Sequence, residues 1–323
     1  MILRYLKLGG RQVSVIGLGA WQVGTKSWGW GTELGPKDVV SLLEAASEAG
    51  INLIDTAELY GKGESERQIG LALKRAINSF VIASKVSPWN LREQSVYNAA
   101  SGSLQRLGIR HIDLYQLHAA NPFIPIKGTM KGIKRLLAEG KIGYVGVSNF
   151  SLNRWQRAEK ALGTTVVSNQ MEYNLLRPNN YHHMKPMLDE NHLMIAYSPL
   201  GMGLLTGKYD CINKPFGSRQ SIPEFTSGNY VNVRRVMEVI RKIAKSHSAT
   251  ISQISLAWVV ARDRVIAIPG AKSIAQVKEN AEAADIHLTA IEINQLDEVS
   301  QAYKQSFHVP RPFEIYKWLF TRD

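Results

Sequence analysis

Short apolar runs alternate with amphipathic segments along most of this chain. Eight runs have the length and composition of buried β-strands. They cover residues 13–19, 51–55, 80–85, 112–118, 144–149, 166–172, 194–200 and 265–270. The first run belongs to a predicted β-hairpin, residues 5–19, that turns at Gly9 and Gly10.

The segments between these runs carry apolar residues at i, i+3 and i+4 and a polar opposite face, which is the pattern of an amphipathic helix. Six of them cover residues 36–50, 65–75, 92–108, 127–141, 153–163 and 182–192. Further helices are predicted at 233–247, 251–264, 273–285 and 290–304. Several helical segments stop at a glycine, as helix C-termini favour, namely at Gly50, Gly108 and Gly163.

Strands and helices that alternate about every 30 residues favour a closed (β/α)8 TIM barrel. The alternative is a doubly wound open sheet, which binds dinucleotides through G-x-G-x-x-G after its first strand. Residues 17–22 read GLGAWQ, so the third glycine is missing, and no Walker-A segment is present. We therefore expect residues 1–323 to form a single barrel domain with an N-terminal β-hairpin.

Two segments break the alternation. Residues 209–230 are rich in glycine, proline and serine and lack a helical period, which predicts a long loop on the catalytic face. The tail, residues 305–323, holds Phe307, Trp318 and Phe320. We expect it to form a C-terminal extension over the barrel mouth.

The net charge of +12, from 39 basic and 27 acidic residues, fits either a nucleic-acid surface or attraction of a small anion. The basic residues are scattered without a long block, so we expect no nucleic acid and favour a phosphate-bearing cofactor. No apolar stretch approaches the roughly 18–20 residues that span a bilayer, and no secretory pattern opens the chain. Cys211 is the one cysteine, which excludes an intramolecular disulfide. We expect a cytoplasmic protein, monomer or homo-oligomer, with no metal and no membrane partner.

Four proton-handling side chains stand near the ends of three successive strand-like runs. Asp55 closes one run, and Tyr60 follows it by five residues. Lys85 and His118 close the next two runs. Because strand C-termini in a (β/α)8 barrel meet in one bowl, we expect these residues to be neighbours. An acid, a phenol, an amine and an imidazole together form a candidate proton-transfer cluster.

The chemistry of this cluster centres on Tyr60, since a free phenol has a pKa of about 10 and is a poor acid at neutral pH. We expect the Lys85 ammonium to lower that pKa, and a carboxylate such as Asp55 to pair with the ammonium. His118 can donate a hydrogen bond to a carbonyl oxygen. Taken singly, Asp55 is more often a cap and Tyr60 a packed ring, while Lys85 also suits a surface lysine and His118 a core imidazole. The hypothesis of a proton-transfer cluster depends on all four residues lying at neighbouring strand ends.

At these residues the chain resembles the aldo-keto reductase superfamily, and the likeness covers nearly all of it. The matching segments are DTAELYGKGESE at 55–66, IASK at 82–85, IDLYQLH at 112–118, GVSNF at 146–150, NQMEYN at 169–174, YSPLGMGLLTGKY at 197–209 and IPGAKSIAQVKEN at 268–280. The resemblance implies a barrel that binds NADPH, with NADH possible, and reduces a small-molecule aldehyde or ketone by hydride transfer. It implies Tyr60 as general acid, Lys85 and Asp55 as the residues that tune it, and His118 as the residue that orients the carbonyl.

The resemblance also implies contacts with the cofactor. Ser148, Asn149 and Gln170 would hold the carboxamide, and Tyr197 would stack on the nicotinamide. The glycine-rich segment 201–208 would let the backbone approach the pyrophosphate. The full set of expected cofactor residues is Gly19, Ala20, Trp21, Ser148, Asn149, Gln170, Tyr197, Ser198, Pro199, Leu200, Gly201, Gly203, Lys208, Gly270, Lys272, Ser273, Gln276, Glu279 and Asn280.

In this set Lys272 and Ser273 would grip the adenosine 2′-phosphate, while Glu279 and Asn280 would meet the adenine. Gln276 stands where some branches of the superfamily carry an arginine, so the preference for NADPH depends on Lys272.

Tryptophans are candidate walls of the substrate bowl. Trp21 follows the first strand and Trp89 follows Lys85, and core packing is the alternative for each. We expect the loop that carries Trp28 and Trp30 to reach this bowl as well.

Two other functions stay open. A nucleotide-sensing subunit resembling the β subunits of potassium channels would keep both the cofactor and the four residues. A barrel isomerase or aldolase would instead use Lys85 to form a Schiff base.

Overall fold

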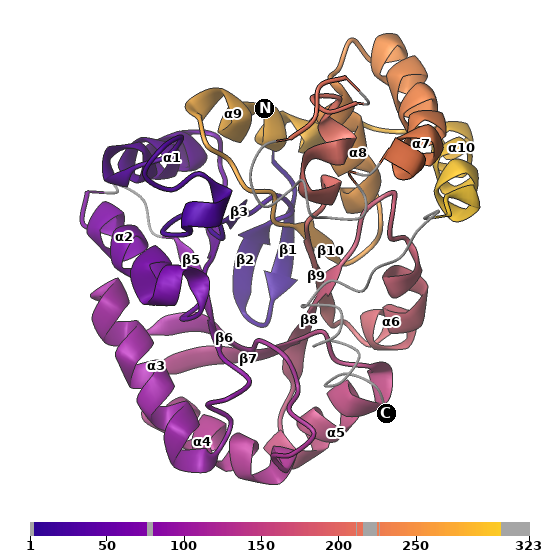
Figure 1. Cartoon of the computed structure of the whole chain (residues 1–323). Helices are drawn as coiled ribbons and strands as arrows, with labels where there is room; N and C mark the ends of the chain where they lie inside the picture. The colour runs from indigo at the N-terminus through magenta and orange to yellow at the C-terminus, as the bar shows by residue number, and fades with distance from the viewer. Residues whose placement is uncertain (1–2, 76–79, 211, 216–224, 226, 305–323) are drawn as a thin grey trace.

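The computed structural model describes residues 3–75, 80–210, 212–215, 225 and 227–304. Eight parallel strands form its centre (Figure 1). They are β3 (Leu18–Gly19), β4 (Leu53–Asp55), β5 (Val81–Val86), β6 (Ile112–Leu117), β7 (Ile142–Ser148), β8 (Val166–Glu172), β9 (Leu193–Tyr197) and β10 (Val265–Ala267). Each strand pairs in parallel with its neighbour in the chain, so the order in the sheet is the order in the sequence.

The first and last strands also meet, which closes the sheet. Ile16 and Gly19 form parallel bridges with Ala267 and Gly270, and the Gly17 N–H donates to the Ala267 carbonyl at 2.8 Å. A side chain at Gly19 would lie 2.7 Å from the Ile268 carbonyl oxygen, so this seam requires a glycine. The predicted (β/α)8 barrel is confirmed.

Helices surround the strands, as Figure 1 shows. They are α1 (Pro36–Glu48), α2 (Glu64–Leu73), α3 (Glu93–Leu107), α4 (Ile126–Ala138), α5 (Leu152–Leu162), α6 (Asn179–Asp189), α7 (Ser227–Ser246), α8 (Ile251–Val260), α9 (Ile274–Glu282) and α10 (Ala290–Ala302). The helices α1 to α6 overlap the six predicted amphipathic segments, whereas residues 252–260 of α8 are all buried. In α5, Ser151 caps the first turn by accepting the Arg154 N–H, and Gly163 ends the helix at a φ of 70°. None of the helices described is long and apolar enough to cross a bilayer.

The N-terminal hairpin pairs β1 (Tyr5–Leu8) with β2 (Arg11–Ser14) and closes one end of the barrel. Leu8 and Val13 are fully buried and pack among apolar side chains of the strands. The Asn52 amide, just before β4, donates to the Gln12 carbonyl at 2.9 Å. The hairpin therefore covers the N-terminal ends of the strands, and the opposite end, where Asp55 lies, is the mouth.

Several element boundaries differ from prediction by a few residues, and two of these differences concern the first strand and the long loop. The regular strand after the hairpin is only Leu18–Gly19, because residues 13–14 pair within the hairpin instead. The predicted loop 209–230 ends earlier, since α7 already begins at Ser227. The expected C-terminal extension, residues 305–323, and Cys211 lie outside the described residues.

Candidate active site

A cavity of about 1100 Å³ opens at the C-terminal ends of the strands. Nearly all the predicted site residues line it, namely Gly19, Ala20, Trp21, Asp55, Tyr60, Trp89, His118, Ser148, Asn149, Gln170, Tyr197, Ser198, Pro199, Leu200, Gly203, Lys208, Gly270, Lys272, Gln276, Glu279 and Asn280. Lys85, Gly201 and Ser273 do not line it. Small-molecule pockets usually enclose about 300–1000 Å³. This cavity therefore has room for an extended dinucleotide beside a small substrate.

Lys85 lies behind the cavity wall and connects two members of the predicted proton-transfer cluster, Asp55 and Tyr60. It lies within β5, whose six residues are all buried, and its side chain is inaccessible to solvent. Its Nζ donates to Asp55 Oδ1 at 2.5 Å, to the Thr56 carbonyl at 2.9 Å and to the Tyr60 hydroxyl at 3.0 Å. The predicted pairing of a buried ammonium with Asp55 is confirmed.

The turn that carries Tyr60 depends on a glycine. Tyr60 opens a 3-10 turn, Tyr60–Gly63, directly before α2, and Gly61 has a φ of 56°. A side chain at Gly61 would lie 2.2 Å from the Gly24 carbonyl oxygen. Only glycine allows this close approach, which holds the phenol above Lys85.

Burial raises the pKa of Tyr60. The Lys85 ammonium lowers it, as expected from the sequence, but it does not outweigh burial, and Asp55 adds a further upward influence. The expected net lowering of the Tyr60 pKa was therefore wrong. For Lys85, burial alone would lower the pKa, but Asp55 and Tyr60 together raise it. At neutral pH the site therefore holds a neutral phenol beside a charged amine.

His118 stands edge-on to the Tyr60 ring, with ring centroids 5.7 Å apart and planes at 80°. Burial, and then the Lys85 charge, lower its pKa to about 3. The imidazole is therefore neutral at physiological pH. Its Nδ1 is buried and has no hydrogen-bond partner in the described structure. A neutral imidazole of this kind can donate one hydrogen bond to a carbonyl oxygen.

Gln116 is a site residue that the sequence did not single out. It is fully buried in β6, in register with Lys85 on β5. Its Nε2 donates to Asp55 Oδ2 at 3.1 Å, and Gln170 Nε2 donates to the same oxygen at 2.8 Å. Gln170 Nε2 also donates to Gln116 Oε1 at 3.2 Å. Because an ionised carboxylate only accepts, Asp55 sets the orientation of both amides.

Replacing Gln116 by leucine should lower the free energy of unfolding by about 1–3 kcal/mol, because a buried amide network would lose a member. Urea unfolding of Gln116→Leu and wild type measures the difference. Gln295→Leu, at an exposed position of α10, is the control and should change stability by less than about 0.5 kcal/mol. Equal stabilities of the Gln116 and Gln295 variants would contradict the prediction.

The residues expected to hold the carboxamide form a connected group. Ser148 Oγ donates to the Gln170 carbonyl at 3.0 Å, and Asn149 Nδ2 donates to Ser148 Oγ at 3.0 Å. The Tyr197 hydroxyl donates to Asn149 Oδ1 at 3.0 Å. Asn149 has a φ of 57°, which asparagine tolerates better than most residues.

Gln170 tests whether a nicotinamide fits. Its side chain is 2% exposed, and its Nε2 is engaged by Asp55 and Gln116. Among the described residues its Oε1 accepts no hydrogen bond. A carboxamide N–H would satisfy this acceptor, so the donor set and the cavity fit a nicotinamide dinucleotide.

Backbone turns shape the cavity wall between its two ends. The segment Gly201–Thr206 is an irregular 3-10 turn in which Met202 and Gly203 have φ values of 57° and 104°. Gly203, Gly207 and Lys208 line the cavity, whereas Gly201 packs against Leu176. The exposed backbone and the Lys208 charge suit a pyrophosphate.

The far end of the cavity is formed by the start of α9. Ser273 caps this helix by accepting the Gln276 N–H, and Gln276 Oε1 accepts the Lys272 N–H at 2.8 Å. The Lys272 ammonium donates to Glu33 Oε2 at 2.7 Å. Glu279 lines the cavity while accepting from the Thr250 hydroxyl at 2.6 Å. Ser273 thus acts here through the helix cap rather than by lining the cavity.

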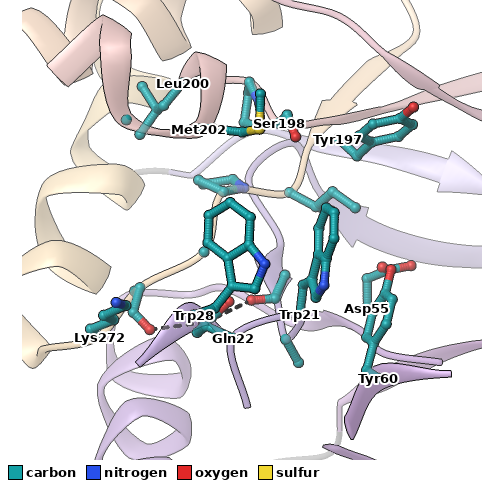
Figure 2. Close-up of a pocket in the computed structure, with 18 of the residues that line it drawn as sticks. Trp21, Gln22, Trp28, Asp55, Tyr60, Tyr197, Ser198, Leu200, Met202 and Lys272 are labelled. Atoms are coloured by element: carbon teal, nitrogen blue, oxygen red, sulfur yellow. Dashed lines mark hydrogen bonds between the residues drawn. The ribbon is translucent and has the colours of Figure 1, made fainter. Parts of the chain in front are cut away.

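Aromatic rings lie between the end of the cavity at Tyr60 and the end at Lys272. Trp21 stacks near Tyr60 at 6.0 Å and contacts Trp28 at 5.3 Å between centroids. Figure 2 shows both indoles between Lys272 and Tyr60. Trp89 also lines the cavity and is 59% exposed, whereas Trp30 does not line it.

Gln22 is a further cavity residue that the sequence did not single out. Its Nε2 donates to the carbonyls of Gly19 and Ala271, both at 3.0 Å. It thereby joins the first loop to the segment that carries Lys272. Gln22 directly follows Trp21, a predicted cavity residue, and this position in the sequence could have indicated that it lines the cavity.

Residues 15–301 match the model of the aldo/keto reductase family, so the chain belongs to this family. An uncharacterized oxidoreductase of Mycobacterium tuberculosis (strain ATCC 25618 / H37Rv) is 40% identical over 304 residues, or 94% of each chain. A methylglyoxal reductase of Escherichia coli (strain K12) is 31% identical over 291 residues, covering 90% of this chain and 92% of the relative. The crystal structure of an aldo-keto reductase from Klebsiella pneumoniae in complex with NADPH has a TM-score of 0.73 at 29% identity, covering 96% of this chain and 100% of that one.

Proposed function

We propose that this protein is an NADPH-dependent reductase of aldehyde or ketone carbonyls, carried by one domain over residues 1–323. The main support is the hydrogen bond of 3.0 Å between the buried Lys85 ammonium and the hydroxyl of Tyr60, which with Asp55 lines a dinucleotide-sized cavity. The NADPH complex of the Klebsiella pneumoniae relative supports the choice of cofactor. A single cysteine suits the reducing cytoplasm.

The protein's own residues have distinct roles in this proposal. Bound NADPH supplies the hydride. Tyr60 donates its proton to the carbonyl oxygen, and the Lys85 ammonium stabilises the phenolate that remains. Neutral His118 donates a hydrogen bond that orients the carbonyl. Asp55 keeps Lys85 charged in its buried position.

Other residues bind the cofactor. Ser148, Asn149 and Gln170 hold the carboxamide, and the half-buried Tyr197 ring stacks on the nicotinamide. Lys272 binds the 2′-phosphate, and NADH binds more weakly because it lacks that group.

The direct test follows loss of NADPH absorbance with a panel of carbonyl compounds that includes methylglyoxal and benzaldehyde, with NADH run alongside. We expect multiple turnovers with at least one compound and faster reaction with NADPH. A single hydride transfer followed by very slow cofactor release would favour the nucleotide sensor. Borohydride trapping of a Lys85 adduct, without NADPH consumption, would favour the Schiff-base alternative.

Lys272→Ala should weaken NADPH binding by about ten- to hundredfold, because a charge-assisted bond to phosphate is lost. NADH binding should change by less than about twofold, since no phosphate reaches this residue. Fluorescence titration measures both dissociation constants. Lys278→Ala, at an exposed position of α9, removes an equal charge and is the control. Equal weakening of NADPH and NADH would show that Lys272 does not read the 2′-phosphate.

A further inference from the structure

Glu33 is an acidic residue at the end of the cavity where the proposed function needs a cation. It lies in the loop between β3 and α1 and lines the cavity together with Lys272. The two side chains pair at 2.7 Å although 239 positions separate them in the chain. This pair joins the loop after the first barrel strand to the segment after the last one.

The surroundings hold the Lys272 ammonium against this loop. A side chain at Gly29 would lie 2.9 Å from Lys272 Nζ, and Gly29 has a φ of 94°, so glycine leaves the room that the ammonium occupies. The Lys272 backbone is held by Gln276, and its side chain is 20% exposed. Glu33 is 60% exposed. The Lys272 ammonium is thus the more buried member of the pair, and the Glu33 carboxylate is the more exposed one.

We propose that Glu33 competes with the cofactor's 2′-phosphate for Lys272 and thereby sets the preference of this protein for NADPH over NADH. The proposal rests on the proposed binding of a nicotinamide dinucleotide in this cavity. A phosphate with a charge of about −1.5 to −2 and three acceptor oxygens displaces a single exposed carboxylate from the ammonium. Breaking the ion pair and bringing the phosphate near Glu33 both subtract from NADPH affinity. NADH leaves the pair intact and incurs neither loss.

Glu33→Gln removes the competing charge and keeps the shape of the side chain. We expect NADPH and NADP+ to bind roughly three- to tenfold more tightly, since exposed ion pairs are weak and phosphate repulsion adds to them. NADH should change by less than about twofold. The gain should appear mainly as slower release of NADP+.

The experiment titrates NADPH, NADP+ and NADH by fluorescence into wild type, Glu33→Gln and Glu33→Asp. Glu298→Gln, at an exposed position of α10, removes an equal charge elsewhere and is the control. Thermal unfolding shows that each variant is folded. Glu33→Asp keeps the charge and should stay within about twofold of wild type. Raising NaCl to about 1 M should reduce the difference between Glu33→Gln and wild type, because salt screens exposed charges.

A double variant isolates the interaction. In the Lys272→Ala background there is no ion pair for Glu33→Gln to remove. Only the repulsion between Glu33 and the phosphate is then lost, so Glu33→Gln should tighten NADPH binding by no more than about twofold. Equal tightening of NADPH and NADH, or no change in either, would overturn the proposal for Glu33 while leaving carbonyl reduction in place. Failure of both nucleotides to bind wild type would overturn the proposed function as well.

Discussion

Tyr60→Phe should bind NADPH as wild type does and lose carbonyl reduction by roughly a hundred- to ten-thousandfold in kcat. The substitution removes one oxygen atom, the proton donor, and keeps the ring that stacks near Trp21. Stopped-flow measurement of NADPH oxidation, with a fluorescence titration of the cofactor, separates turnover from binding.

The matched control for this prediction is Tyr5→Phe. Tyr5 lies on β1 at the closed end of the barrel, is 44% exposed and donates to the Gly50 carbonyl at 2.8 Å. The Tyr5→Phe substitution removes the same atom, a phenolic oxygen, far from the cavity, so turnover should stay at the wild-type level. A Tyr60→Phe variant with wild-type kcat would show that another group donates the proton.

The barrel and the proximity of Asp55, Tyr60, Lys85 and His118 could be predicted because both depend on local patterns. Apolar runs that alternate with amphipathic segments define a (β/α)8 barrel, and the barrel in turn brings strand ends together. Asp55, Lys85 and His118 were found because each stands where an apolar run ends. Tyr60 could be placed beside Asp55 because only a short turn separates the two residues in the sequence.

Gln116 was missed because it lies inside an apolar run rather than at its end. Its contact with Asp55 follows from the register of β6 against β5, which pairs Gln116 with Lys85. Register between strands depends on tertiary packing and cannot be read from one strand alone. The alternation of side chains along a strand could have indicated it, because Gln116 and His118 are two residues apart and therefore point to the same face of the strand.

The net pKa of Tyr60 could not be predicted for a related reason. The sequence indicated the sign of the Lys85 influence, and the structure agrees with that sign. The extent of burial decides the net direction, and burial depends on how Trp21 and the neighbouring loops cover the ring. Glu33 was likewise missed, because its pairing with Lys272 joins opposite ends of the chain.

Lys85→Met should abolish most activity and also destabilise the fold by about 3–5 kcal/mol, because the substitution leaves Asp55 buried without its counter-ion. Lys85 is fully buried and Asp55 is 2% exposed, so water cannot replace the lost partner. Turnover should fall by roughly a hundredfold or more, since the phenolate of Tyr60 would lose its stabilising charge. Urea unfolding and NADPH oxidation measure the two losses. Lys127→Met, at an exposed position of α4, should leave both unchanged.

The double variant Lys85→Met with Asp55→Asn separates the two roles of the lysine. Removing both charges eliminates the unpaired carboxylate, so most of the lost stability should return. Activity should stay low, because neither the ammonium nor its carboxylate then acts on Tyr60. A double variant that regained both stability and turnover would show that Lys85 serves only to neutralise Asp55. A single variant as stable as wild type would contradict the buried ion pair from which the proposed chemistry starts.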